Sequence, residues 1–226
     1  MQHSQSDFAQ RVRPLRPGFS IGTSGRVGTL GLVVTRRGGD APLLLSSSHV
    51  LSGKPSSHAY DVYQPGGRDR SRGDAPVAST LCCIRPSRNA PNWTEAALAR
   101  PHDACVVSAL HPLGPIRRIC SRLQVGQLLV KVGRTTGLVH GRVIAIDWSG
   151  FVRFRYGRGF FARQVLVRGE EPVSLHGDSG SVWLTEDGEA AALNFASFGR
   201  GVVSVSTPMV RIFDRLGIEI FQPKGN

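Results

Sequence analysis

A serine between two glycines, in Gly177-Asp178-Ser179-Gly180, is the stretch of this sequence best suited to chemistry. The glycines allow backbone conformations that a Cβ would block, so successive N–H groups can point into one small space. Such a space could hold an acyl oxygen, with the Ser179 hydroxyl beside it as a nucleophile. The same residue types also form ordinary hairpin turns. The chemical interpretation therefore requires a base and an acid from elsewhere in the chain.

A serine hydroxyl is a weak nucleophile, and it needs a base to take its proton and an acid to orient that base. Of the seven histidines, His49 alone follows a strongly apolar stretch, residues 42–47, early in the chain. A buried strand there would hold its ring rigidly against a cleft. Asp103 opens another apolar stretch, which makes it the candidate acid. Taken singly, each has a simpler interpretation: a satisfied core histidine for His49 and a strand-end cap for Asp103.

Short apolar stretches separated by turns recur along the whole chain and predict an all-β protein. In the first half they include residues 29–35, 42–47 and 76–84, and the second half repeats the pattern between 127 and 206. Two sets of about six short strands indicate two packed antiparallel β-barrels.

One segment near the C-terminus has a convincing helical pattern. Residues 208–216 carry an apolar stripe, with Thr207 in the N-cap position and Gly217 directly after the end. We therefore predict a short C-terminal α-helix. Residues 94–99 could form at most one further helical turn, within a long irregular connection.

We expect five segments along the chain. Residues 1–20 are polar and basic, which predicts a flexible N-terminal arm without a core-facing side. The others are a first barrel over 21–112 with His49 and Asp103, a crossing segment over 113–124, a second barrel over 125–206 with Ser179, and a helix and tail over 207–226.

The charge of the chain constrains its partners. The formal net charge is +12, from 28 basic and 16 acidic residues. The arginines are scattered rather than clustered with aromatic side chains, which argues against nucleic acid as a partner and favours a solvated basic surface. A basic rim could still favour an acidic protein or peptide substrate.

The sequence has no stretch long and apolar enough to cross a membrane, and its polar N-terminus lacks a hydrophobic secretory core. The cysteines, Cys82, Cys83, Cys105 and Cys120, lie in strand-like stretches and are expected to be free thiols of a reducing compartment. Their spacing suits neither a zinc site nor a disulfide framework. We therefore expect a cytoplasmic protein with no membrane segment, metal or cofactor.

Three segments in this order resemble the trypsin-like serine proteases of the chymotrypsin fold. They are residues 46–51 around His49, residues 103–107 beginning at Asp103, and residues 177–181 around Ser179. Residues 28–31 and 132–138 are further similar to the bacterial relatives of the plant narrow-leaf proteases. The resemblance covers residues 20 to 218.

This resemblance implies a serine endopeptidase that forms an acyl-enzyme on Ser179. It implies His49 as the general base and Asp103 as the acid that orients it. The backbone N–H groups of Gly177 and Ser179 would form the oxyanion hole, and no metal or organic cofactor would be needed.

The resemblance also places residues that bind the substrate. Ser197, Phe198 and Gly199 match the family segment whose backbone pairs with an extended substrate as an added strand, although an ordinary edge strand would have the same pattern. Gly201 matches the glycine that lines the primary pocket.

The side-chain preference at the cleaved bond follows from the same comparison. Val173 stands where trypsin has an acid at the pocket floor, which argues against a preference for Arg or Lys. A small or apolar residue is expected, and Arg200 or His176 at the rim leaves an acidic residue as the alternative.

Asp178 bears on whether the protein must be cleaved to become active. In digestive relatives the matching acid pairs with an amino terminus freed by cleavage, and Ser20 before Ile21-Gly22 is no trypsin-like cleavage site. We expect an enzyme that is competent without cleavage, with Asp178 satisfied inside the fold. Two other functions stay open: an inactive protease-fold binding module and a basic nucleic-acid-binding β protein.

Overall fold

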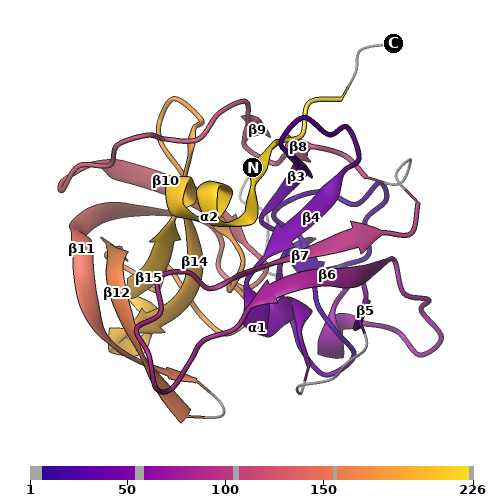
Figure 1. The fold of residues 1–226 in the computed structure, drawn as a ribbon, viewed down its shortest axis with the longest axis horizontal. Helices are drawn as coiled ribbons and strands as arrows, with labels where there is room; N and C mark the ends of the chain where they lie inside the picture. Colours follow the sequence, from indigo (N-terminus) through magenta and orange to yellow (C-terminus); the bar gives the residue numbers. More distant parts are fainter. Residues whose placement is uncertain (1–6, 54–58, 104–106, 155–156, 224–226) are drawn as a thin grey trace.

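The computed structural model describes residues 7–53, 59–103, 107–154 and 157–223. Two units of β-strands lie side by side, one built mainly from the first half of the chain and one from the second (Figure 1). The first is an antiparallel sheet in the order β16-β3-β4-β7-β6-β5. Its strands are β3 (Leu32–Arg36), β4 (Leu43–Ser46), β5 (Asp61–Val62), β6 (Ala78–Ile84), β7 (Ala96–Pro101) and β16 (Ile218–Ile220).

The second unit is a closed barrel in the order β10-β11-β12-β15-β14-β13. Its strands are β10 (Leu128–Gly133), β11 (Gly137–Phe154), β12 (Gly157–Arg168), β13 (Val182–Leu184), β14 (Ala190–Phe198) and β15 (Val203–Pro208). The pairing of Val130 with Leu184 closes it. The prediction of an all-β protein with two packed units of about six strands each is confirmed.

Short elements complete the fold. The small strand pairs are β1 (Ser20–Ile21) with β2 (Gly28–Thr29) and β8 (Leu110–His111) with β9 (Gly114–Pro115), and the short 3₁₀ turns are η1 (Asp7–Ala9), η2 (Gly67–Asp69) and η4 (Gly199–Gly201). The helices are α1 (Ser48–Leu51) and α2 (Met209–Leu216). Within the described residues, neither helix is long and apolar enough to cross a membrane.

Helix α2 confirms the predicted C-terminal helix, although it begins at Met209 with Pro208 as the N-cap, because Thr207 and Pro208 belong to β15. Met209, Ile212 and Phe213 are buried on one face, and Gly217 ends the helix with φ +60°, a left-handed conformation that suits glycine. The chain then returns to the first unit, because Ile218–Ile220 pairs with β3 instead of forming a tail.

A shared apolar core holds the two units together. Leu45 and Leu98 of the first unit pack in one cluster with Val182 and Leu193 of the second, and α2 covers the same cluster through Phe213. Because buried side chains are close-packed, this core fixes the relative position of the two units. Residues contributed by each unit therefore meet in a defined geometry at their junction.

The prediction of a flexible arm over residues 1–20 is wrong for the described part. Phe8 and Leu15 are buried, Phe8 packs on Phe19 with ring centroids 5.2 Å apart, and Leu15 forms a β-bridge with Val107. Single apolar residues anchor this segment, because Phe8 and Leu15 pack into apolar clusters with residues of the folded units. Residues 1–6 lie outside the described part, as do Cys105 and most of the stretch that follows Asp103.

The buried ring of His111 gives a testable pH dependence of stability. Its Nδ1 accepts the Leu113 N–H at 3.1 Å, and burial lowers the pKa of His111 from 6.5 to about 4. The unfolded chain binds a proton between these pH values and the folded chain does not, so stability falls as the pH drops. We expect a loss of about 2 kcal/mol between pH 7 and pH 4.5 from this residue.

Urea unfolding of the wild type and of His111→Gln at these two pH values measures this effect. The variant should lose about 2 kcal/mol less on acidification than the wild type does. Equal losses in the two proteins would contradict the assignment.

Candidate active site

The turn that carries Ser179 is held in shape by its own glycines and by contacts from the first half of the chain. Gly177 and Gly180 have φ values of +109° and +96°, which only glycine adopts readily. A Cβ on Gly180 would overlap the Thr29 carbonyl. From the first half of the chain, the N–H of Thr29 in β2 donates to the Ser179 carbonyl at 2.8 Å, and the Thr29 hydroxyl donates to the Gly177 carbonyl at 2.9 Å. The turn therefore owes its shape to contacts from both halves of the chain.

The Gly177 N–H is directed by the carbonyl on the other side of its peptide bond. The His176 carbonyl accepts a hydrogen bond from the Thr135 hydroxyl at 2.8 Å. In a trans peptide the C=O and N–H point in opposite directions. The Gly177 N–H therefore points away from Thr135, on the side where Gly177 lines a cavity.

The same argument directs the Ser179 N–H. The Asp178 carbonyl accepts three hydrogen bonds, from the Ser181 N–H at 3.0 Å, the Ser181 hydroxyl at 2.6 Å and the Asn194 side-chain amide at 3.0 Å. All three donors belong to buried residues. The Ser179 N–H therefore points away from the core, toward the same cavity.

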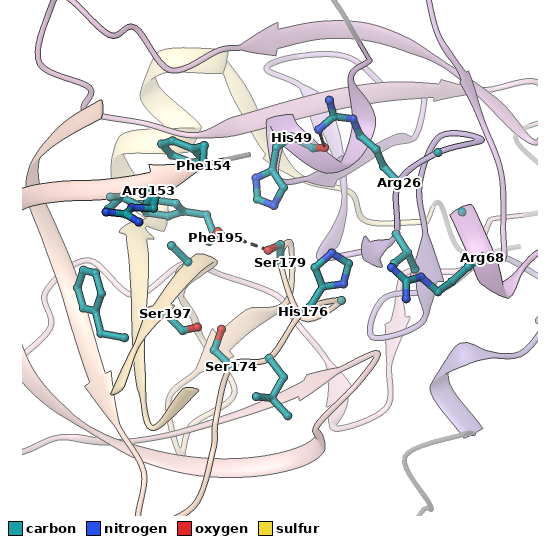
Figure 2. A pocket seen from close by; sticks show the side chains of 18 of the residues that line it. Arg26, His49, Arg68, Arg153, Phe154, Ser174, His176, Ser179, Phe195 and Ser197 are labelled. Carbon is teal, nitrogen blue, oxygen red and sulfur yellow. Dashed lines mark hydrogen bonds between the residues drawn. The ribbon is translucent and has the colours of Figure 1, made fainter. Parts of the chain in front are cut away.

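His49 and Ser179 face each other across this cavity of about 650 Å³, and Figure 2 shows the imidazole ring directed at the Ser179 hydroxyl. The hydroxyl donates a long hydrogen bond of 3.4 Å to the Phe195 carbonyl. His49 lies in the single turn of α1, directly after β4, instead of at a strand end.

The partner of the His49 ring is Glu95. A carboxylate oxygen of Glu95 lies 3.0 Å from His49 Nδ1 and also accepts the His49 backbone N–H at 2.8 Å. The register of β4 with β7 explains this contact, because Ser46 pairs with Ala97 and so brings the residue before β7 next to the start of α1. Glu95 is fully buried.

Two opposing effects act on the pKa of Glu95. Burial alone would raise the pKa of this carboxyl, but the charge of His49 and the hydrogen bonds from it lower the pKa below the ordinary value. The carboxylate is therefore ionised at neutral pH and holds His49 Nδ1 in its protonated form.

The prediction of Asp103 as the orienting acid is wrong. Glu95 directly precedes β7 and Asp103 follows its other end, and a six-residue strand spans about 17 Å. Asp103 is exposed, and the neighbouring His102 N–H donates to the Val77 carbonyl at the far end of the sheet. The strand register thus places Asp103 away from the site and Glu95 within it.

Asp178 is satisfied inside the fold, as expected. Its carboxylate accepts the N–H groups of Thr135 at 2.8 Å, Thr136 at 3.0 Å and Leu175 at 2.8 Å. The buried Lys131 lies close enough that the charge of Asp178 raises its pKa, although burial lowers that pKa more strongly.

The predicted substrate-binding residues divide into two groups. His176, Ser197 and Phe198 line the cavity with Ser179, together with Ser174. Val173 instead belongs to the core of the second barrel and is buried, which corrects its place at the pocket floor.

Three other predicted residues follow β14 in the turn η4. The buried Gly201 supports the cavity wall from behind, since its carbonyl accepts the N–H groups of Val173 and Ser174. Gly199 and Arg200 are exposed and do not line the cavity.

The charged side chains that line the cavity are positive. Arg26, Arg68 and Arg153 line it, whereas no Asp or Glu does among the described residues (Figure 2). His176 lies on the same wall, and its pKa is lowered by burial and by the nearby positive charges, Arg68 first among them. No group of three or more His, Cys, Asp or Glu side chains in the described ranges is arranged to hold a metal ion.

Comparison with known proteins agrees with this architecture. No protein-family model and no curated protein sequence matches the chain. Protease A of Thermobifida fusca is similar in structure, with a TM-score of 0.67 and 16% identity over 91% of this chain and 98% of that one. A protease of Nocardiopsis gives a TM-score of 0.64 and 15% identity over 92% and 100% of the two chains.

A third similar structure is described as a glutamic acid specific serine protease that uses a histidine triad in substrate binding. Its TM-score is 0.65 with 17% identity, over 91% of this chain and all of that one. The protein therefore has the two-barrel fold of the chymotrypsin-like serine proteases, with the Ser179 turn, His49 and Glu95 gathered between its two units.

Proposed function

We propose that this protein is a serine endopeptidase that cleaves a protein substrate through an acyl-enzyme on Ser179. One observation carries the proposal: a buried carboxylate, Glu95, holds the ring of His49, and that ring faces Ser179 across a cavity. A nucleophile, its base and an orienting acid are the three groups that acyl transfer to serine requires.

The proposed reaction begins when the Ser179 hydroxyl attacks the carbonyl carbon of the scissile peptide bond. His49 Nε2 takes the hydroxyl proton, and the Glu95 carboxylate stabilises the imidazolium that forms. The carbonyl oxygen becomes an oxyanion, which accepts hydrogen bonds from the Gly177 and Ser179 N–H groups. Each such donor is worth about 10²–10³ in rate.

The first intermediate then collapses to the acyl-enzyme. His49 gives its proton to the departing amine, and the C–N bond breaks. A water molecule repeats the sequence on the ester: His49 takes a proton from the water, the second oxyanion occupies the same site, and Ser179 recovers its proton as the acid product leaves. No cofactor takes part in any of these steps.

The substrate backbone would lie along the end of β14. Ser197 and Phe198 end this strand beside the cavity, so an extended peptide could add to it there. For the side chain at the cleaved bond we propose a small or apolar residue, because Ser174 and Phe195 line the cavity and no acid does among its described lining residues. An acidic residue at this position is the alternative that His176 at the rim supports.

Labelling by a fluorophosphonate tests the function. This reagent phosphonylates a serine only where a base activates it and an oxyanion hole stabilises the adduct. We expect mass spectrometry to find the adduct on Ser179 of the wild type and to find none in Ser179→Ala or His49→Ala. A folded wild type that stays unlabelled would overturn the proposal and favour a binding module.

A further inference from the structure

A second cavity, of about 640 Å³, adjoins the one that holds Ser179. Arg26, His49 and Phe154 line both cavities, so the two are continuous around the His49 ring. The second cavity lies between residues 85–88 of the first unit and the start of β12, Gly157–Gly159, in the second. A peptide long enough to extend past His49 would enter it.

The charged side chains that line this second cavity are also positive. Arg85, Arg88 and Arg158 line it in addition to Arg26, and no Asp or Glu is among its described lining residues. Carboxylates of the described chain form ion pairs with other arginines instead, as in the pairs Arg37–Asp214, Arg118–Glu189, Arg134–Asp69 and Arg163–Asp147. The positive charge around His49 is thus left uncompensated at Arg85, Arg88 and Arg158, within the part that the structure describes.

Neutral partners hold these three arginines in place. Arg85 donates to the Tyr60 hydroxyl at 3.0 Å, and the Arg158 guanidinium lies 4.7 Å from the ring centroid of Phe151. Arg88 packs on Gly157, where an added Cβ would come within 3.0 Å of its Nε. Such contacts orient a guanidinium and leave its charge available to a carboxylate.

Ser48 adds an independent observation. Ser48 is one of the residues that line the second cavity, it is only 1% exposed, and its buried hydroxyl has no hydrogen-bond partner in the described part of the chain. Buried polar atoms are normally paired, so an unpaired one beside a cavity points to a ligand that completes it. A carboxylate can accept this hydroxyl and the arginine N–H groups together.

We propose that the second cavity binds acidic side chains of the substrate polypeptide, so that the enzyme selects bonds flanked by an acidic segment. This inference rests on the proposed function, since it takes the occupant to be the substrate of Ser179. A peptide fits the site better than a nucleic acid does, because the cavity continues directly into the one where a peptide bond would be cleaved.

Binding to Ser179→Ala tests the proposal without requiring turnover. Two fluorescent peptides would be compared, identical except that one carries Glu and the other Gln at the positions flanking a central apolar residue. We expect the Glu peptide to bind at least about tenfold more tightly at low ionic strength, and added salt to remove most of the difference. The triple change Arg85→Gln, Arg88→Gln and Arg158→Gln should bring the ratio close to one.

Arg215→Gln is the control for the single changes Arg85→Gln, Arg88→Gln and Arg158→Gln, because each of these four variants loses one positive charge and Arg215 occupies an exposed position on α2. It should keep the preference for the Glu peptide. Equal binding of the two peptides to Ser179→Ala, or a preference that survives the triple change, would overturn the inference. Displacement of the Glu peptide by a single-stranded oligonucleotide at physiological salt would instead favour nucleic acid as the occupant.

The two proposals fail in different ways. If fluorophosphonate labels Ser179 but the Glu and Gln peptides bind equally, only the acidic preference is wrong. If the wild type is not labelled and Ser179→Ala still prefers the Glu peptide, the cavity is an acidic-peptide site on an inactive protease fold.

Discussion

Replacing Glu95 by Gln should lower kcat/KM by about 10⁴-fold, whereas replacing Asp103 by Asn should leave it unchanged. Glu95 is fully buried against His49 Nδ1, so no water can take over its role. A Gln side chain has no charge to stabilise the imidazolium. It can also offer its amide NH₂ to Nδ1, which would put the ring proton on Nε2 and remove the base.

Initial rates on a peptide selected from a library would measure both effects, with circular dichroism to establish that each variant folds. Glu95→Asp is a useful intermediate, because it keeps the charge but shortens the side chain by one methylene. It should retain more activity than Glu95→Gln. A larger loss in Asp103→Asn than in Glu95→Gln would refute the assignment of the acid.

That Ser179 and His49 belong to one site could be predicted from sequence, because the signals around both residues are local. Gly177 and Gly180 flank Ser179 within one turn, and an apolar strand directly precedes α1 and His49. The alternation of strands and turns likewise gave the all-β class. Each of these features depends on residues that are neighbours in the chain.

The acid could not be chosen in the same way, because it depends on strand register. Glu95 and Asp103 both border an apolar stretch, and the alanines after Glu95 favour a helix over a strand in isolation. Only the pairing of β4 with β7 decides which end of that stretch meets His49. Glu95 is distinguished as the acid by its burial beside the His49 ring and not by a local sequence pattern.

The order of the N-terminal segment also depends on tertiary contacts that local sequence patterns do not reveal. Phe8 and Leu15 are single apolar residues among polar and basic neighbours, so no periodic pattern predicts an element there. Their burial is created by surfaces of the folded barrels, such as Phe19 with Val132 for Phe8. Tertiary contacts of this kind have no sequence signal of their own.

The second large effect is expected at Asp178. Its carboxylate joins three backbone N–H groups and lies near Lys131, and a Cβ on Gly133 would touch both charged groups. Changing Asp178 to Asn should therefore destabilise the fold by about 3–5 kcal/mol, because a buried ammonium loses its counter-charge. Catalysis should also fall by about 10²-fold or more, since the turn then no longer holds both oxyanion N–H groups in position.

The variant Lys131→Met separates the loss of the counter-charge of Lys131 from the loss of the hydrogen bonds that Asp178 accepts. Met fills a similar volume without a charge, and Asp178 keeps its three N–H donors, so this variant should be milder than Asp178→Asn. Adding Lys131→Met to Asp178→Asn should recover part of the lost stability in urea unfolding, a positive coupling that unrelated sites would not show. The absence of coupling would mean that Lys131 does not balance Asp178.

The arrangement around Asp178 also predicts how the proposed protease activity arises. Ile21 is buried in β1 and paired with Gly28, and Asp178 already has its partners, so no freed amino terminus is needed to order the turn. The fluorophosphonate-labelled protein should therefore retain the residues before Ile21 when its intact mass is measured. Labelling confined to a species that begins at Ile21 would show that cleavage, and not Lys131, completes the site.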